Sequence, residues 1–371
     1  MKQSSSSFLR VGLIGCGNIS NAYFQGLRPF AKWARITACA DLDAGKARAK
    51  AEEHQISAVR SPDDLLASPE IDIVLNLTIP QSHVAVNLMA LRAGKHVYCE
   101  KPFSLTTREG VKVLAEAAKR KLRVGCAPDT VLGGGIQTCR QLLGKGLIGR
   151  PVAAMANMLC HGYENWHPSP AFYYDKGGGP LFDMGPYYLT ALISALGPIK
   201  TVSASAVTAF KERVISSDPL RGKKITVKTP THLTGVVDFA SGAVGTITMS
   251  FDVWAHHVPR LEIYGTQGSL SCPDPNTFDG PVGLWTTADR EWKDIPLTHS
   301  PETERGFGLA EMAYGILKKK PHRATGELGL HVVEVMEAFH ESANKGRRIS
   351  LKTTCCQPAP LKHGLPPGRI E

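Results

Sequence analysis

Lys101 stands at the end of a short apolar run, His96 to Cys99, and is followed at once by a proline. Because proline has no backbone N–H to donate to a sheet, the strand predicted over this run must end where the lysine is presented. A lysine at the carboxyl end of a strand can polarise a ligand oxygen or exchange a proton with it. We therefore predict that Glu100 and Lys101 face a bound molecule.

Asp183 and Tyr187 form a second pair suited to chemistry. They lie four residues apart in a segment with helical spacing, Leu181 to Leu196, so both side chains project from one face of the predicted helix. A carboxylate can orient a hydroxyl group, and a phenol can exchange its proton. The structural alternative is a core tyrosine that bonds a neighbour. We predict that Lys101, Asp183 and Tyr187 are the catalytic residues.

A glycine-rich turn, Gly15-Cys-Gly-Asn-Ile-Ser20, follows an apolar run and precedes a helical segment. In this strand–turn–helix context, Gly15 permits the tight turn and Gly17 lets backbone N–H groups approach a pyrophosphate at the helix N-terminus. Asp41 ends the next predicted strand about twenty residues later, where its carboxylate can accept hydrogen bonds from a ribose. Because Leu42 and Asp43 follow it in place of a basic pair, the pattern favours NAD over NADP.

Polar residues also gather where the third apolar strand, Ile71 to Leu77, ends. Thr78 and Pro80 lie at that end, and His83 lies in the turn that enters the next helix. A lone histidine there either contacts the cofactor or only caps and packs a helix, and the sequence supports both equally. The residues predicted to bind the cofactor are Gly15, Gly17, Asn18, Ile19, Asp41, Thr78, Pro80, His83, Glu100 and Lys101.

The segment from His161 to Tyr174 is rich in aromatic side chains among prolines and a glycine, which suits a loop better than a strand. Aromatic faces with polar edges suit sugar rings. The alternative is a loop that packs its aromatic side chains inward. The residues predicted to bind substrate are His161, Tyr163, Trp166, His167 and Asp183.

The sequence predicts two regions of different secondary structure that carry these residues. Strands and helices alternate through Ala127, which predicts right-handed crossovers and an α/β, doubly wound parallel sheet over residues 1–128. Later, Thr231 to Phe239 and Ala243 to Trp254 flank Ser241-Gly242 and alternate apolar with polar residues, as in a hairpin. Apolar residues also recur at helical spacing at 309–316 and at 328–339, which predicts two amphipathic helices. The hairpin and these helices together predict an α+β domain over 129–351. We expect residues 352–371 to be an arm or disordered.

Four stretches in combination resemble the Gfo/Idh/MocA family, that is, glucose-fructose oxidoreductase, inositol dehydrogenase and the rhizopine-catabolism oxidoreductases. The stretches are Gly-Leu-Ile-Gly-Cys-Gly-Asn-Ile-Ser at 12–20, Glu100-Lys-Pro102, Gly-Gly-Gly-Pro-Leu-Phe-Asp-Met-Gly at 177–185 and Glu-Ile-Tyr-Gly-Thr-Gln-Gly-Ser at 262–269. The resemblance implies a Rossmann domain followed by an open, mostly antiparallel sheet with helices on one face and often an oligomer contact on the other. Most relatives have histidine where this chain has Tyr187; glucose-fructose oxidoreductase and dimeric dihydrodiol dehydrogenase have tyrosine.

Composition narrows the class of protein. The 371 residues carry a formal charge of +10, but the basic runs at 119–121, 318–320 and 345–348 fall at predicted helix ends, where cations suit the helix dipole, so nucleic acid is not expected as a partner. Nine cysteines without a C-x-x-C pair predict buried thiols and no metal. Met1 to Arg10 contains neither a secretory signal nor a membrane anchor, and we expect a cytoplasmic protein.

From these features we expect an NAD-dependent enzyme that transfers a hydride between nicotinamide and a secondary hydroxyl or ketone of a sugar, polyol or related cyclic alcohol. We also expect a homodimer or homotetramer. Two alternatives from other classes stay open. One is a glycosidase that oxidises its sugar transiently with bound NAD, and the other is a non-catalytic nucleotide-binding regulator on the same fold.

Overall fold

The computed structural model describes residues 8–366 and 368–371, which fall into two compact units. The first comprises residues up to Gly134, His299–Leu330 and Leu361–Glu371, and the second comprises Gly135–Thr298 and His331–Pro360. These limits differ from the divisions expected at 128 and 352, since each unit draws on segments that are far apart in the chain. The expectation for Met1 to Arg10 falls mainly on residues 1–7, outside the described part.

The first unit is built on a parallel six-stranded sheet with the strand order β3-β2-β1-β4-β5-β6. Its elements in chain order are β1 (Leu9–Ile14), α1 (Ser20–Leu27), η1 (Arg28–Phe30), β2 (Ala34–Ala40), α2 (Ala44–His54), β3 (Ala58–Val59), α3 (Pro62–Ala67), β4 (Ile73–Asn76), η2 (Pro80–Ser82), α4 (His83–Arg92), β5 (His96–Cys99), α5 (Thr107–Arg120), β6 (Val124–Cys126) and η3 (Thr130–Leu132). This order confirms the doubly wound sheet, in which β1 and β4 flank the point where the strand order reverses.

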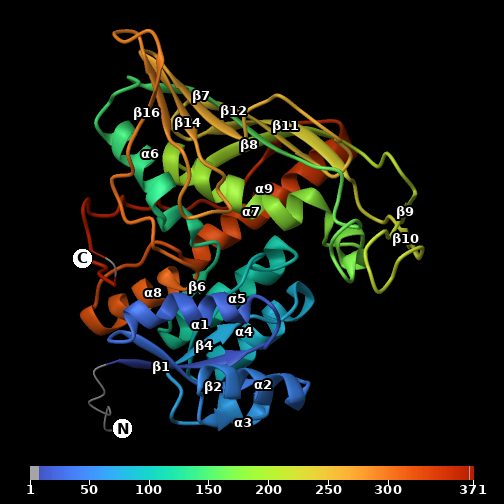
Figure 1. Cartoon of the computed structure of the whole chain (residues 1–371), viewed down its shortest axis with the longest axis vertical. Coiled ribbons are helices and arrows are strands. Elements are labelled where there is room, and N and C mark those ends of the chain that lie inside the picture. The colour runs from blue at the N-terminus through green and yellow to red at the C-terminus, as the bar shows by residue number, and fades with distance from the viewer. Residues whose placement is uncertain (1–7, 367) are drawn as a thin grey trace. The chain divides into compact units, whose positions relative to one another are not determined.

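The chain returns to this unit through α8 (Phe307–Lys318), which packs beside α1 (Figure 1). The buried carboxylate of Asp129 accepts hydrogen bonds from the backbone N–H groups of Gly306 and Gly308, at 2.8 and 2.9 Å. Because the first N–H groups of a helix have no partner within the helix, this contact caps α8 from a distant part of the chain.

The second unit is built on a nine-stranded sheet with the order β16-β15-β14-β13-β7-β12-β11-β8-β17, in which only β7 and β12 pair in parallel. This confirms the mostly antiparallel sheet. Its elements are α6 (Gly134–Gly144), β7 (Pro151–Leu159), η4 (Pro170–Tyr174), α7 (Gly179–Leu196), β8 (Ile199–Val207), β9 (Glu212–Val214), β10 (Lys224–Thr226), β11 (His232–Phe239), β12 (Val244–Ser250), β13 (Leu261–Gly265), β14 (Gly268–Cys272), β15 (Gly283–Thr286), β16 (Trp292–Asp294), α9 (Gly326–Lys345) and β17 (Ile349–Ser350).

Side chains along β12 alternate between buried and more exposed positions, and the buried ones face the core of this unit. Ile247 and Met249 are fully buried, whereas Thr246, just before them in the chain, is exposed. The buried side chains meet α7, and the apolar stripe of α9, which includes Val335, Met336 and Phe339, is fully buried as well. Figure 1 shows the helices gathered on one side of the large sheet, with the two-stranded β9–β10 hairpin at its end. The predicted hairpin and both helical stripes are confirmed.

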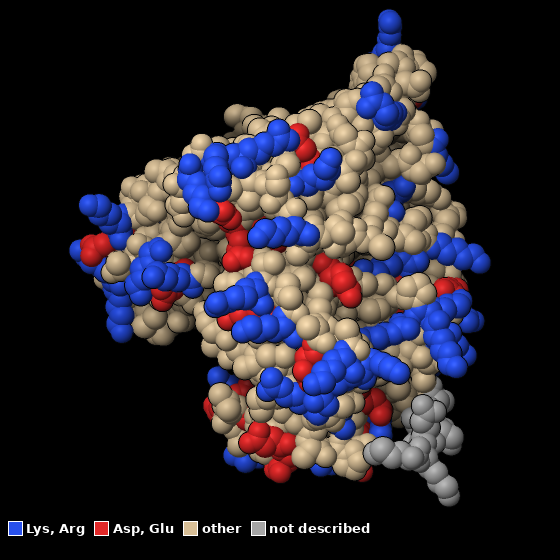
Figure 2. All heavy atoms as spheres, turned by 180° about the vertical axis from the view of Figure 1, so that it is seen from behind, with Lys and Arg blue, Asp and Glu red and all other residues tan. Residues whose placement is uncertain are grey.

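The basic runs end helices, as expected. Lys121 caps α5, Lys319 caps α8, and Lys345 lies in the last turn of α9. On the face shown in Figure 2, Lys and Arg side chains are spread over the surface with Asp and Glu among them. None of the helices in the described ranges is both long enough and apolar enough to span a membrane.

Candidate active site

The turn after β1 has the geometry that a dinucleotide needs. Gly15 has a φ of +103°, and a Cβ added to it would lie 2.6 Å from the carbonyl carbon of Leu77, which follows β4. Only glycine fits where these two loops meet. A Cβ on Gly17 would meet nothing within 4 Å, so the backbone there is open to a ligand.

Helix α1 presents its N-terminus at this turn. Its N-cap residue, Ile19, makes no side-chain capping bond, and the first turn contains no acidic residue. The positive end of the helix dipole at this terminus favours a pyrophosphate. The hydroxyl of Ser20 donates to the carbonyl of Gly17 (2.7 Å) and holds the turn in shape.

Asp41 lies at the end of β2, beside this turn. Its two carboxylate oxygens accept hydrogen bonds from the backbone N–H groups of Cys16 (2.8 Å) and Asp43 (2.9 Å), which fix its orientation. Each oxygen keeps a further lone pair for a ribose hydroxyl. Gly15, Gly17, Ile19 and Asp41 therefore fit the diphosphate and ribose of NAD.

Asp41 also borders a cavity of about 940 Å³ whose lining includes Arg48 and Arg60. Sequence reasoning missed both arginines, because one lies within α2 and the other lies after the two-residue strand β3. Arg60 pairs with Glu70 at 2.6 Å, whereas Arg48 is exposed on its helix. Positive charge therefore does lie near the predicted ribose site.

Glu100 and His83 are buried, and their side chains are hydrogen-bonded within the protein. Glu100 is 7% exposed, and it accepts hydrogen bonds from the hydroxyl of Tyr23 and the backbone N–H of Lys101, both at 2.8 Å. His83 is 1% exposed, and its ring nitrogens lie 2.7 Å from the carbonyl oxygen of Pro102 and 2.9 Å from that of Thr78. Burial lowers the pKa of His83, and these two hydrogen bonds oppose that effect. Both residues hold the backbone around the half-buried Lys101.

Asp183 and Tyr187 lie in the first half of α7, which begins after the glycine run at 177–179. Asp183 is partly buried, and Tyr187 is 5% exposed. The hydroxyl of Tyr163 donates a hydrogen bond to Asp183. Burial, together with the charge of Asp183, raises the pKa of Tyr163 far above its ordinary value, so this phenol stays protonated.

The segment after β7 is a loop that ends in the short helix η4, and its aromatic residues divide between core and surface. Tyr174 is fully buried, whereas Trp166 is exposed. Tyr163 contacts the ring of Phe251 at a centroid distance of 4.8 Å, and His167 packs edge-on against Trp166 at 5.4 Å.

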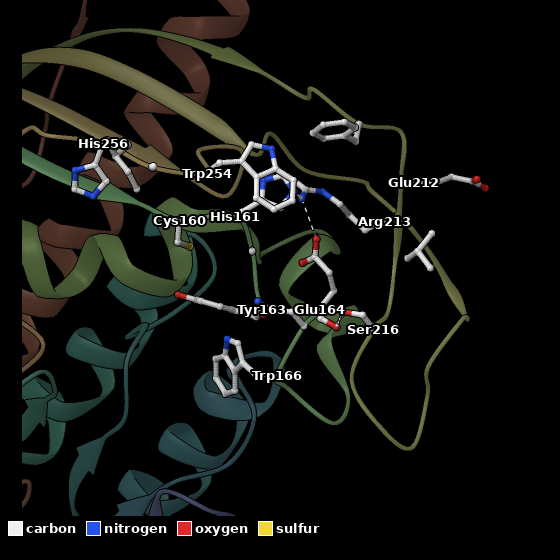
Figure 3. Close-up of a pocket in the computed structure, with 16 residues that line it drawn as sticks. Cys160, His161, Tyr163, Glu164, Trp166, Glu212, Arg213, Ser216, Trp254 and His256 are labelled. Carbon is white, nitrogen blue, oxygen red and sulfur yellow. Dashed lines mark hydrogen bonds and ion pairs between the residues drawn. The ribbon is translucent and has the colours of Figure 1, made fainter.

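A second cavity of about 940 Å³ lies beside this loop, lined by His161, Tyr163, Glu164 and Trp166 together with Phe210, Arg213 and Trp254 (Figure 3). Figure 3 shows Trp254 lying over His161 and Arg213 reaching toward Glu164. The Arg213 guanidinium is 4% exposed and pairs with Glu164 (2.9 Å) and Asp252. Sequence reasoning missed Arg213 and Trp254. One signal was present: Trp254 continues the polar side of the alternation in Thr246, Thr248, Ser250 and Asp252.

The strand order, the glycine turn and Asp41 define a protein of the dinucleotide-binding class. The family model described as "Oxidoreductase family, NAD-binding Rossmann fold" matches residues 9–127, and the one described as "GFO/IDH/MocA C-terminal domain" matches residues 136–271. The chain therefore belongs to the Gfo/Idh/MocA family of oxidoreductases, and its first unit is an NAD-binding Rossmann domain.

Named relatives cover nearly the whole chain. The chain is 26% identical to 1,5-anhydro-D-fructose reductase of Ensifer adhaerens, over 93% of this chain and 99% of the relative. It is 24% identical to D-glucoside 3-dehydrogenase of Escherichia coli K12, over 94% and 99%. Among solved structures, an NAD-binding oxidoreductase from Klebsiella pneumoniae superposes with a TM-score of 0.81 at 23% identity, over 94% of this chain and 100% of that one.

Proposed function

We propose that the protein is an NAD-dependent dehydrogenase or reductase that acts on a secondary hydroxyl or ketone of a sugar, polyol or related cyclic alcohol. The observation that carries the proposal is the hydrogen bond from Tyr163 to Asp183. Tyr163 itself lines a cavity with aromatic rings, an environment that suits a ring with hydroxyl groups on its edge, and it links that cavity to the carboxylate of α7. The names of the two relatives above, a sugar reductase and a glucoside dehydrogenase, support the same class of substrate.

The roles of the chain's own residues follow from the reaction. When bound, NAD supplies the group that accepts a hydride from the carbinol carbon. Tyr187 takes the proton of the substrate hydroxyl as the carbonyl forms, and Lys101 polarises the same oxygen. Asp183, held by Tyr163, accepts a hydrogen bond from a neighbouring hydroxyl and so orients the ring. The proton roles of Tyr187 and Lys101 can also be exchanged.

NAD is the proposed cofactor, and NADP is expected to bind less well. A 2′-phosphate would lie beside the carboxylate of Asp41, which repels it. The backbone bonds from Cys16 and Asp43 keep that carboxylate in place.

A substrate panel tests the proposal. Polyols, aldoses and glycosides are offered with NAD, and nicotinamide absorbance and product release are followed together. We expect NAD reduction in proportion to a ketone product for at least one of them, with the D183N variant raising KM. Glycoside cleavage without net change in nicotinamide would indicate a transiently oxidising glycosidase, and binding without any turnover would indicate a regulator.

A further inference from the structure

The aromatic cavity of the second unit is larger than a single sugar ring requires. Its volume of about 940 Å³ lies at the upper end of the roughly 300–1,000 Å³ typical of sites for drug-sized ligands. The β9–β10 hairpin contributes Glu212, Arg213 and Val214 to one side, and Cys160 and Tyr163 lie on the side nearer α7. The cavity therefore extends from Cys160 and Tyr163 toward the hairpin.

Trp254 provides a rigid and open aromatic face in this cavity. One side of its indole is stacked on the ring of His161, with centroids 3.3 Å apart and planes 15° apart, while the side chain is 82% exposed. Phe210, which is 45% exposed, meets His161 edge-on at 6.1 Å. An indole that is supported on one side and open on the other is pre-organised to stack on a second ring at little entropic cost.

The charges around Trp254 disfavour an anionic ligand. Arg213 is already bonded to Glu164, Asp252 and the carbonyl oxygen of Phe251 (2.8 Å). Glu212 pairs with Lys224 at 2.9 Å. The lining itself contains two carboxylates, Glu164 and Glu212, and the already paired Arg213, so a neutral ring is favoured over a phosphate or a carboxylate.

Tyr163 connects this cavity to the proposed reaction site. Its ring lines the cavity, and its hydroxyl is bonded to Asp183 on α7. A ring whose hydroxyl is oriented by Asp183 would direct its next substituent past Tyr163 and toward Trp254.

We propose that this cavity is a subsite for the second ring of a glycoside, either an aglycone or another sugar, so that the substrates are glycosides or oligosaccharides oxidised on the ring held at Asp183. This inference rests on the proposed function and adds the class of substrate to it. The Trp254 indole stacks on the second ring, and the slightly negative balance of the surrounding ion pairs disfavours anionic substituents.

The experiment compares the methyl, phenyl and glucosyl β-glycosides of glucose, and the same three glycosides of galactose as a second series. The three members of a series share one ring and differ in the group attached to it. Affinity for the protein loaded with NAD is measured by saturation-transfer NMR, and turnover by nicotinamide absorbance. In the wild type we expect the phenyl or the glucosyl glycoside to bind more tightly than the methyl glycoside. A larger gain in affinity for the phenyl glycoside would indicate an aglycone subsite, and a larger gain for the glucosyl glycoside would indicate a sugar subsite.

Trp254→Ala should weaken binding of the two-ring ligands by roughly 3- to 10-fold, the range expected for losing one aromatic stacking contact, and leave the methyl glycoside unchanged. Trp292→Ala is the matched control, because Trp292 is 51% exposed on β16 and does not line the cavity. Trp254→Phe should retain most of the difference in affinity between the two-ring ligands and the methyl glycoside, because it keeps an aromatic face.

Two results would overturn the inference. One is equal affinity for all three glycosides in the wild type. The other is a Trp254→Ala variant that changes the oligomeric state in light scattering while ligand discrimination stays the same, since the indole would then be a contact between copies of the chain. Discrimination that depends on Trp254 without any NAD reduction would refute the proposed reaction and leave the subsite in place.

Discussion

Tyr163 and Tyr187 are the same residue type, but their surroundings separate their roles. The hydroxyl of Tyr163 donates a hydrogen bond to Asp183, and burial, together with the charge of that carboxylate, raises the pKa of the phenol, so it stays protonated and does not act as the base. Tyr187 lies on α7, one turn beyond Asp183, where the sequence pattern predicts the proton-exchanging group. The environment of Tyr163 therefore suits it to orientation, and Tyr187 stays the predicted group for proton transfer.

Tyr187→Phe keeps the ring and removes only the hydroxyl. We expect the rate of hydride transfer to fall by roughly 10²- to 10⁴-fold, the usual contribution of a positioned acid–base group, while NAD affinity hardly changes. Single-turnover absorbance measures the rate, and calorimetry measures the affinity. Tyr163→Phe is the comparison variant, for which we expect mainly a higher KM. Near wild-type single-turnover rates in Tyr187→Phe would remove this residue from the mechanism.

Cofactor choice depends on charges that the sequence only partly reveals. The spacing of Asp41 from the glycine turn predicts its position, but Arg48 and Arg60 reach the same cavity from α2 and from the segment after β3. Wild-type protein should bind NAD more tightly than NADP. Asp41→Ala should narrow the difference by removing the repulsion, and adding Arg48→Ala should widen it again by removing an attractive charge. Calorimetry that shows equal or better NADP binding by the wild type would contradict the assignment.

The individual residues that the sequence predicts are those with a local geometric requirement. Gly15 must adopt a positive φ, and Asp41 must end a strand at a fixed distance from the turn. Arg213 has no such local signature, because its partners Glu164 and Asp252 lie 49 and 39 residues away. Its role as a buried ion-pair centre becomes visible only when β9 is placed beside the loop after β7.

At the scale of elements, long periodic segments were predicted closely, and short strands were not. The pattern predicted a helix at 181–196 and a helical stripe at 328–339, and the structure has α7 over Gly179–Leu196 and α9 over Gly326–Lys345. In contrast, β3 has two residues and β16 has three, too few to show a period. The attachment of α8 to the first unit depends on its cap by Asp129, which no local pattern encodes.

Helix α9 is tied to its neighbours by a histidine whose tautomer the structure fixes. The backbone N–H of Ile199, at the start of β8, donates to Nε2 of His331 (3.1 Å), so this nitrogen carries no proton. Nδ1 lies 3.0 Å from Oγ1 of Thr353 and donates to it. Burial lowers the pKa of His331 to about 4.

This contact predicts a loss of stability in mild acid. In the unfolded chain His331 binds a proton below about pH 6.5, and in the folded chain only below about pH 4. The contribution of His331 to the free energy of unfolding is therefore complete above about pH 6.5 and is lost as the pH falls to about 4. A shift of this size corresponds to about 3 kcal/mol. His331→Gln keeps an acceptor for Ile199 and cannot titrate, so denaturant unfolding should show less acid sensitivity. The exposed His256→Gln is the control, and an unchanged pH dependence in His331→Gln would contradict the prediction.

At the scale of the whole molecule, chain order and compact units do not coincide. Residues 299–330 belong with the parallel sheet although the chain has already formed the second sheet. Residues 352–360 form no helix or strand, yet they are fixed to the second unit: Gln357 donates to the carbonyl oxygen of Ser194 (2.8 Å), and the carbonyl oxygen of Pro358 accepts from Arg140 (2.8 Å). This part of the predicted tail is an arm held by hydrogen bonds from side chains to backbone carbonyl groups, which composition alone does not encode.

Helices cover one face of the large sheet of the second unit. The other face carries no helix, and the prediction of a homo-oligomer rests on it. Alternate residues on β8, β11 and β12, such as Ser203, Thr234 and Thr246, are small and exposed, and Val236 and Val244 are 42% and 41% exposed among them. A sheet face of small side chains can pack closely against its symmetric copy. We therefore expect a homo-oligomer formed through this face.

Light scattering at micromolar concentration measures the molar mass of the protein in solution and so tests whether it is an oligomer. Val236→Lys puts a charge within the proposed contact on every copy of the chain, so it should shift the protein to a 40 kDa species. Val111→Lys is the matched control, because Val111 is similarly exposed on α5 of the first unit and should leave the assembly intact. A wild type that is only monomeric, or an oligomer that tolerates Val236→Lys, would show that this face meets water and that any assembly uses another surface.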